Sequence, residues 1–309
     1  MDATLRLAVE DDAPAVTAII NEGYPEPSAI EQVRERIRAA RADGRLITRL
    51  VATDAAGQVI GYGHALREDW MAPGLFWVHC AGSALFGAAR DWAATRGATT
   101  FFAEAREHLP ESRHFAERHG FQAERHIFES TLDLTTFDEG PFVAALDTGR
   151  AAGLRFLTMA EAGDTIEARR ALWEVERTIA RDIPGNSESA IRPFEEFLQR
   201  VCDAPGYDSA LQFIAADGDA WIGLALTESL PETNALYNSV TGVLPAWRGR
   251  GVAQALKLLV IRAANQRGVA YIRTHNDSEN APMLAVNRKL GYRPEPGYYR
   301  MRRDLAAGG

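Results

Sequence analysis

The stretch that decides the fold of this chain is VLPAWRGRGVAQALK, residues 243–257. Two arginines and two glycines alternate from Arg248 to Gly251, directly ahead of apolar residues that recur at helical spacing. Residues 237–243 are rich in apolar and β-branched side chains, and Pro245 follows them, which is typical of the end of a strand. The arginine–glycine run is therefore predicted to be a strand-to-helix turn.

A glycine-rich turn at the start of a helix is a typical place for an anion to bind. The first N–H groups of a helix have no partner within it and lie at the positive end of its dipole. Glycines let a ligand approach that backbone closely, and Arg248 and Arg250 add donors that suit phosphate. The run matches neither the GxxxxGK[ST] loop nor the GxGxxG dinucleotide fingerprint. It is thus predicted to bind a diphosphate of another kind.

Bulk composition excludes several classes of protein. The 309 residues are 46% hydrophobic and 25% charged, as in folded globular proteins, and the net charge of −8 argues against a nucleic-acid partner. The N-terminal residues are not expected to form a signal peptide, and no apolar run approaches the roughly 20 residues that cross a bilayer. Cys80 and Cys202 are far apart, so no metal site is expected. A cytoplasmic protein without membrane contact is expected.

The two halves of the chain repeat one pattern. Strand, turn and helix follow one another from Leu5 and again from Leu154, and two hairpins carry matching glycines, Gly61 and Gly223. We expect an α/β (α+β) fold of two tandem domains, each a mixed, mostly antiparallel sheet flanked by helices. The expected domains span residues 1–140 and 150–309, with a turn-rich join at 136–153.

The predicted turn resembles the acyl-CoA loop of the GNAT acetyltransferase superfamily, [RQ]-x-x-G-x-[GA]. The order of strands and the Lys289–Tyr292 ending of a later helix are similar to the family as well, over most of residues 154–305. The length and tandem layout resemble those of mycothiol synthases within this superfamily. The resemblance implies an acyltransferase with acetyl-CoA as donor and a small-molecule amine as acceptor, acting as a monomer or homodimer without a metal.

The resemblance also implies positions that contact the cofactor. Main-chain groups of Thr241, Gly242 and Val243 would align the pantetheine arm and polarise the thioester carbonyl. Asn276 and Asn280 would line the cleft, although Asn280 is also placed to cap a helix before Pro282. Backbone N–H groups of the turn would hold the pyrophosphate of coenzyme A, at Arg248, Gly249, Arg250, Gly251, Val252 and Ala253.

Acetyl transfer to an amine needs a base for the amine and donors for the oxyanion. Glu228, at the end of a predicted strand, is the first candidate for the base. Asp182, between two predicted helices, is the second candidate. Tyr237 and His275 are weaker ones, and a base that acts through water also remains open.

The departing thiolate raises a separate question. In the family a tyrosine commonly stands seven positions after the equivalent of Asn280 and protonates the sulfur, but here that position is Asn287. An amide donates a hydrogen bond but supplies no proton at neutral pH. Either Tyr298, Tyr299 or Tyr237 serves instead, or the thiolate leaves unaided.

The first half lacks the arginine–glycine run. The segment from Val78 to Gly97 is six residues shorter than its match, Val243 to Gly268. The N-terminal half is therefore expected to keep the fold without the cofactor, with a rebuilt CoA loop as the alternative. The lost loop, Asn287 and the apolar Leu236 argue against a mycothiol synthase, and a catalytically silent acyl-CoA sensor or scaffold remains open. Acceptor specificity is expected from residues 179–197.

Overall fold

The computed structural model describes residues 3–23, 27–40, 46–68, 71–183 and 192–305. The chain divides into two units, of which unit 1 comprises residues 1–126 and 297–309 and unit 2 comprises residues 127–296. Each unit contains a sheet flanked by helices, with one parallel pair of strands among antiparallel ones. The predicted architecture of two tandem mixed, mostly antiparallel domains is confirmed.

Unit 1 is built on a sheet in the order β1-β2-β3-β4-β5-β13. The strands are β1 (Thr4–Leu7), β2 (Leu46–Thr53), β3 (Val59–Arg67), β4 (Leu75–Cys80), β5 (Thr100–Arg106) and β13 (Tyr298–Asp304). The helices are α1 (Ala13–Gly23), α2 (Ile30–Ala39), α3 (Ser83–Ala94) and α4 (Pro110–Arg118). The long strand β6 (Gln122–Asp133) begins in unit 1 and continues into unit 2.

Unit 2 is built on a sheet in the order β6-β11-β10-β9-β8-β7, to which the short β12 adds beside β6. The strands are β7 (Leu154–Thr158), β8 (Phe213–Asp217), β9 (Ala220–Leu230), β10 (Ala235–Val243), β11 (Tyr271–Asp277) and β12 (Arg293–Pro294). The helices are α5 (Val143–Ala151), α6 (Ile166–Ala180), α7 (Phe194–Phe197), α8 (Val252–Gln266) and α9 (Ala281–Lys289).

Helices cover both faces of the unit 2 sheet. Successive residues of a strand point to opposite faces. Along β9, Leu224 and Leu226 belong to the core formed with α6 and α7, whereas Ala225 belongs to the core formed with α8. The helix that follows the arginine–glycine run is thus held by a buried apolar face, with Ala255 and Leu256 fully buried.

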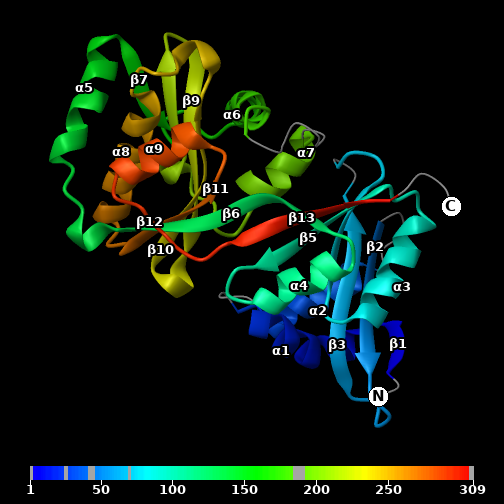
Figure 1. The fold of residues 1–309 in the computed structure, drawn as a ribbon. Coiled ribbons are helices and arrows are strands. Elements are labelled where there is room, and N and C mark those ends of the chain that lie inside the picture. Colours follow the sequence, from blue (N-terminus) through cyan, green and yellow to red (C-terminus); the bar gives the residue numbers. More distant parts are fainter. Residues whose placement is uncertain (1–2, 24–26, 41–45, 69–70, 184–191, 306–309) are drawn as a thin grey trace. The chain divides into compact units, whose positions relative to one another are not determined.

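The last strand of the chain completes unit 1 rather than unit 2. β13 pairs with β5 from Tyr298 opposite Arg106 to Asp304 opposite Thr100 (Figure 1). In unit 2, the edge of β11 is paired instead with the second half of β6, residues 127–133. This division differs from the expected contiguous domains, 1–140 and 150–309, because the partner of an edge strand is set by long-range packing that local sequence patterns do not encode.

The join between the halves also differs from expectation. Instead of turns alone, it contains α5, which packs against α8 in the core of unit 2. Phe142 and Leu146 provide the reason, because they lie on one face at helical spacing and both are buried. The strand order expected for the second half is confirmed, whereas the described part of the first half ends with β6 alone.

The pairing of β13 with β5 leads to a prediction about the stability of unit 1. Met301 of β13 is fully buried in the core of unit 1, beside Phe76 and Phe101. We expect Met301→Ala to destabilise unit 1 by about 2–5 kcal/mol, the usual cost of such a cavity. Hydrogen exchange followed by mass spectrometry should then show faster exchange in β4 and β5. Faster exchange in α8 and β10, with β5 unchanged, would contradict the assignment of β13 to unit 1.

Candidate functional site

Strands β10 and β11 part from each other in the middle of the unit 2 sheet. Their parallel pairing covers only Ala235–Tyr237 opposite Tyr271–Arg273, yet β10 continues to Val243 and β11 to Asp277. A β-bulge interrupts the pairing of β10 with β9 between Asn238 and Val240. Two cavities lie where the strands have separated.

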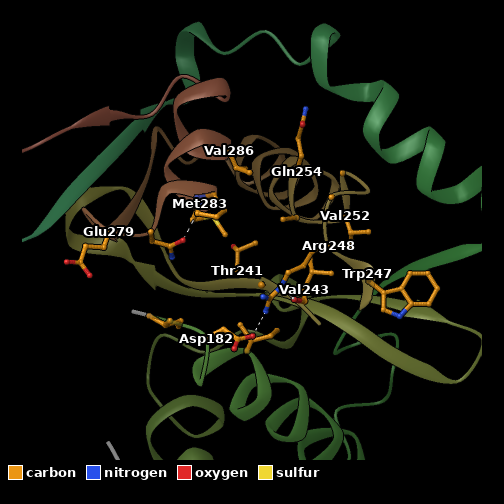
Figure 2. Close-up of a pocket in the computed structure, with 18 residues that line it drawn as sticks. Asp182, Thr241, Val243, Trp247, Arg248, Val252, Gln254, Glu279, Met283 and Val286 are labelled. Carbon is orange, nitrogen blue, oxygen red and sulfur yellow. Dashed lines mark hydrogen bonds and ion pairs between the residues drawn. The ribbon is translucent and has the colours of Figure 1, made fainter. Parts of the chain in front are cut away.

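The larger cavity has a volume of about 500 Å³ and lies between the end of β10 and the first turns of α8 and α9 (Figure 2). Asp182 and Ile183, which follow α6, line it as well. It brings together most of the cofactor residues predicted from the sequence: Thr241, Gly242, Val243, Arg248, Gly249, Gly251, Val252, Ala253 and Asn280.

The turn into α8 depends on two glycines in the left-handed region. Gly249 has φ 74° and Gly251 has φ 77°, a conformation that side-chain-bearing residues rarely adopt. Gly251 is the N-cap of α8 and has no side chain with which to cap the first N–H groups. The helix start therefore has the backbone geometry on which the sequence-based prediction of an anion site rests, and binding of an anion there stays a prediction.

The two arginines of the turn lie differently. Arg248 donates from Nε to the carbonyl of Val243 at 3.0 Å and from Nη2 to Asp182 at 2.5 Å, and Figure 2 shows it reaching toward Asp182. Arg250 does not line the cavity, since its guanidinium lies over the ring of Trp247, 4.8 Å from the centroid. Both side chains thus have partners within the protein that the sequence did not indicate.

The smaller cavity, of about 130 Å³, adjoins the larger one. The two share Ile183, Thr241, Asn280 and Met283. The remaining residues of the smaller cavity come from both sides of the parted strands and from α8: Ser239, Val240, Lys257, Thr274, His275, Asn276 and Asp277. Moving along β10 from Val243 toward Ser239 leads from the larger cavity into the smaller one.

Asn238, which sequence reasoning missed, holds the bulge at this point. Its side chain is 1% exposed and donates from Nδ2 to the carbonyl of Leu226 at 2.9 Å and to that of Val240 at 3.1 Å. Its Oδ1 accepts from Thr241 Oγ1 at 2.9 Å and from Lys257 Nζ at 2.8 Å. An asparagine, a residue depleted in strands, in the centre of β10 was the signal for this role.

Lys257 of α8 was missed as well. It is 2% exposed, and its ammonium also lies over the ring of Tyr292, 4.9 Å from the centroid. Burial disfavours the charged form and lowers the pKa of Lys257 to about 7. The signal in the sequence was a lysine inside the apolar series ALKLLV.

The asparagines of the predicted site take three different positions. Asn280 caps α9, its Oδ1 accepting from the N–H of Met283 at 3.3 Å, and it lines both cavities. Asn287 is 3% exposed and donates from Nδ2 to Asn276 Oδ1 at 2.6 Å. Asn276 in turn donates to Ser130 Oγ at 2.7 Å and lines the smaller cavity. Asn287 therefore lies behind the cavity walls.

The candidate bases are only partly brought together. Glu228 is exposed on β9, opposite Tyr237 of β10, and lines neither cavity. The hydroxyl of Tyr237 is hydrogen-bonded to Nδ1 of His275 at 3.0 Å, and His275 lines the smaller cavity. The alternative acids Tyr298 and Tyr299 belong to β13 of unit 1.

Unit 1 has a comparable cavity without the arginines of the turn. Its β4 and β5 also pair in parallel over three positions only, Leu75–Trp77 opposite Thr100–Phe102. A cavity of about 400 Å³ follows the end of β4 at Cys80 and Gly82, and Phe86 of α3 contributes to its wall. The parting of the strands is thus present in both units, as a duplicated fold requires.

Within the described ranges, no group of three or more His, Cys, Asp or Glu side chains is placed to hold a metal ion. None of the described helices combines the length and the apolar character needed to cross a bilayer.

Comparison with known proteins agrees with this geometry. The profile of the acetyltransferase (GNAT) family matches residues 170–292. A mycothiol acetyltransferase of Beutenbergia cavernae is 27% identical over 86% of this chain and 87% of its own length, and one of Thermobifida fusca is 30% identical over 38% of each chain.

Solved structures extend the likeness to the whole fold. A GCN5-related N-acetyltransferase from Sphaerobacter thermophilus has a TM-score of 0.72 at 20% identity, with 99% of this chain and 96% of that chain covered. A tandem GNAT protein from the clavulanic acid biosynthesis pathway has a TM-score of 0.69 at 16% identity, with 100% of both chains covered. Residues 170–292 are therefore a domain of the acetyltransferase (GNAT) family, which makes the chain an acyltransferase, and the whole chain is similar to a tandem GNAT protein in fold and to a mycothiol acetyltransferase in sequence.

Proposed function

We propose that this enzyme transfers the acetyl group of acetyl-CoA to the amine of a small molecule, by direct attack in a ternary complex in unit 2. The observation that carries the proposal is the larger cavity, which joins a glycine turn and a helix start to the parted end of β10. A helix start attracts phosphate, and a freed strand edge provides main-chain groups for an extended amide-containing chain. Coenzyme A contains both parts.

The donor is proposed to lie along one path through the two cavities. The pyrophosphate would contact the N–H groups between Arg248 and Ala253, and the pantetheine arm would follow Thr241 to Val243. The thioester would then reach the smaller cavity, where β10 has turned away from β11. Main-chain N–H groups beside the bulge are suitable donors for the developing oxyanion.

Arg248 and Asp182 are proposed to shape this path rather than to act in the chemistry. Their ion pair, together with the bond from Arg248 to the carbonyl of Val243, ties the turn to the end of α6 and to β10. Because the carboxylate of Asp182 is occupied by this ion pair, Asp182 is proposed to hold the turn rather than to take the proton of the amine.

The proton of the acceptor amine is proposed to leave through the pair Tyr237 and His275. Histidine is the side chain with a pKa suited to this task near neutral pH, and His275 reaches the smaller cavity. Glu228, the first candidate from the sequence, is proposed to relay the proton to solvent, because it lies opposite Tyr237.

The acceptor is proposed to enter beside residues 179–197, which run from the last turn of α6 through α7. Ile179, Asp182 and Ile183 line the larger cavity, and residues 184–191, including Glu188, lie outside the described residues. The relatives named mycothiol acetyltransferases favour deacetylated mycothiol as one specific acceptor. A non-catalytic acyl-CoA sensor is the second candidate, favoured by the burial of Asn287 in the place of the family's acid.

A thiol-release assay separates these functions. Purified protein with acetyl-CoA would be given a panel of small primary amines that includes deacetylated mycothiol, with free thiol measured over time. Turnover with deacetylated mycothiol alone would identify a mycothiol acetyltransferase. Turnover with other amines would identify an N-acetyltransferase with a different or broader acceptor range. Binding of acetyl-CoA without turnover on any amine would favour the sensor.

The turn itself provides a test of donor binding. We expect Gly251→Glu to weaken acetyl-CoA binding by ~100-fold or more, about 2.7 kcal/mol, because it places a carboxylate and a strained backbone at the helix start. Isothermal titration calorimetry measures the change. It also gives the stoichiometry, expected to be one per chain because the cavity of unit 1 lacks the arginine–glycine run.

Gly268→Glu is the matched control. Gly268 ends α8 with φ 70° and lines neither cavity, so the substitution has the same charge and a similar backbone strain. It should bind acetyl-CoA as the wild type does. Equal loss of affinity in both variants, or retained affinity in Gly251→Glu, would refute the proposed phosphate position.

The proton path is tested by a second pair of substitutions. We expect Tyr237→Phe to lower kcat about 10- to 100-fold with the accepted amine, because it removes the hydroxyl that is bonded to His275. Glu228→Gln, on the neighbouring strand, should change kcat by less than about threefold, since a surface relay is replaceable by water. The reverse order of the two effects would make Glu228 the base instead.

A further inference from the structure

Lys257 lies beside the proposed path of the donor, and the proposed function gives it no role. It is one of two lysines in the chain, the other being the exposed Lys289. It extends from the buried face of α8 into the wall of the smaller cavity, at the point where β10 and β11 part. A buried ammonium is costly to keep without a strong reason.

The surroundings of Lys257 do not neutralise its charge. Its two described contacts are Asn238 Oδ1 and the ring of Tyr292, both uncharged groups. The titratable groups that share the cavity wall with it are His275 and Asp277. A lysine in such surroundings exchanges its proton near neutral pH, which a lysine held by a carboxylate does not.

The reaction needs a proton at this same place. The thiolate of coenzyme A leaves more readily when an acid protonates it. Asn287 cannot supply that proton, and its Nδ2 is directed to Asn276 behind the cavity wall. Tyr237 is hydrogen-bonded to His275 in the proposed path of the amine proton, whereas Lys257 is a proton-bearing group that α8 brings to the thioester end of the path.

We propose that the ammonium of Lys257 is the general acid that protonates the departing thiolate of coenzyme A. The amine nitrogen attacks the thioester carbon, the C–S bond breaks and its electron pair goes to sulfur. Sulfur then takes the proton from Nζ, which leaves neutral Lys257 and free thiol. The proton lost by the attacking amine passes through Tyr237 and His275 to solvent, and Lys257 regains a proton from solvent. This assignment rests on the proposed function.

The direction of proton transfer is favourable. The pKa of Lys257, lowered by burial to about 7, is below the roughly 8.5 of a thiol, so the proton moves from the lysine to the thiolate. The hydrogen bond from Nζ to Asn238 positions the acid, since Asn238 is fixed by its other bonds across the bulge. Asn238 is thus a positioning residue.

The test uses bound coenzyme A and needs no acceptor. If Nζ faces the sulfur, the two groups titrate as a coupled pair, and the thiolate of bound coenzyme A begins to form at a lower pH than that of free coenzyme A, while Lys257 still holds its proton. Ultraviolet absorbance of the thiolate against pH measures the apparent pKa of the bound thiol on the full-length protein. In Lys257→Met the lowered pKa should be lost, while affinity for coenzyme A changes by less than about threefold.

Controls separate this role from a structural one. Lys289→Met removes the other lysine and should leave the thiol pKa as in the wild type. Thermal melting verifies that Lys257→Met folds, as expected for an apolar side chain of similar length in a buried position. With an accepted amine, kcat of Lys257→Met should fall about 10²–10⁴-fold at an unchanged KM for acetyl-CoA.

The outcomes distinguish the two proposals. Equal thiol pKa values in wild type and Lys257→Met, with coenzyme A bound to both, would overturn the role of Lys257 and leave the proposed function in place. Absence of coenzyme A binding to the wild type would overturn both. The role of Lys257 as general acid is supported if the pKa of the bound thiol is lowered in the wild type and in Lys289→Met but not in Lys257→Met.

Discussion

The separation of β10 from β11 is the constraint on which the site of unit 2 depends. Two strands in one sheet normally satisfy each other's backbone groups, so parting them requires other partners for those groups. Asn238 provides them at the bulge, bonding to the carbonyls of Leu226 and Val240 and accepting from Thr241. Thr274 Oγ1 completes the arrangement by donating to the carbonyl of Asn238 at 2.8 Å. One buried amide thus binds backbone carbonyls on both sides of the bulge at the point where the sheet opens.

Local signals in the sequence predicted much of the fold and the mouth of the site. The glycines at 249 and 251, the strand before them and the apolar face of α8 are all short-range features, and the structure places them together around one cavity. The cap at Asn280 was visible for the same reason. The pairing of β13 with β5 could not be predicted in this way, because the two strands lie far apart in the sequence. The contacts of Arg250 and Asn287 were hidden too, since they depend on which tertiary neighbour each side chain meets.

The two units show that the parting of strands and the chemistry of the site are separable. Both have a three-residue parallel pairing that ends at a cavity. Counted back from the glycine that follows each helix, Gly97 or Gly268, the position of Lys257 is occupied in unit 1 by Phe86. Phe86 is buried and lines the cavity of unit 1, so an aromatic ring replaces the ammonium there. The duplicated fold has therefore kept its geometry while its polar groups diverged.

The pairing of β13 with β5 also determines when unit 1 can finish folding during synthesis. A ribosome makes the chain from its N-terminus, and residues 298–304 emerge only after the whole of unit 2. Until then the nascent chain carries an uncovered edge at β5, the kind of edge that recruits other strands. Unit 1 can complete its sheet only after β13, the last strand of the chain, has been made. Unit 1 therefore cannot finish folding before unit 2 has been synthesised.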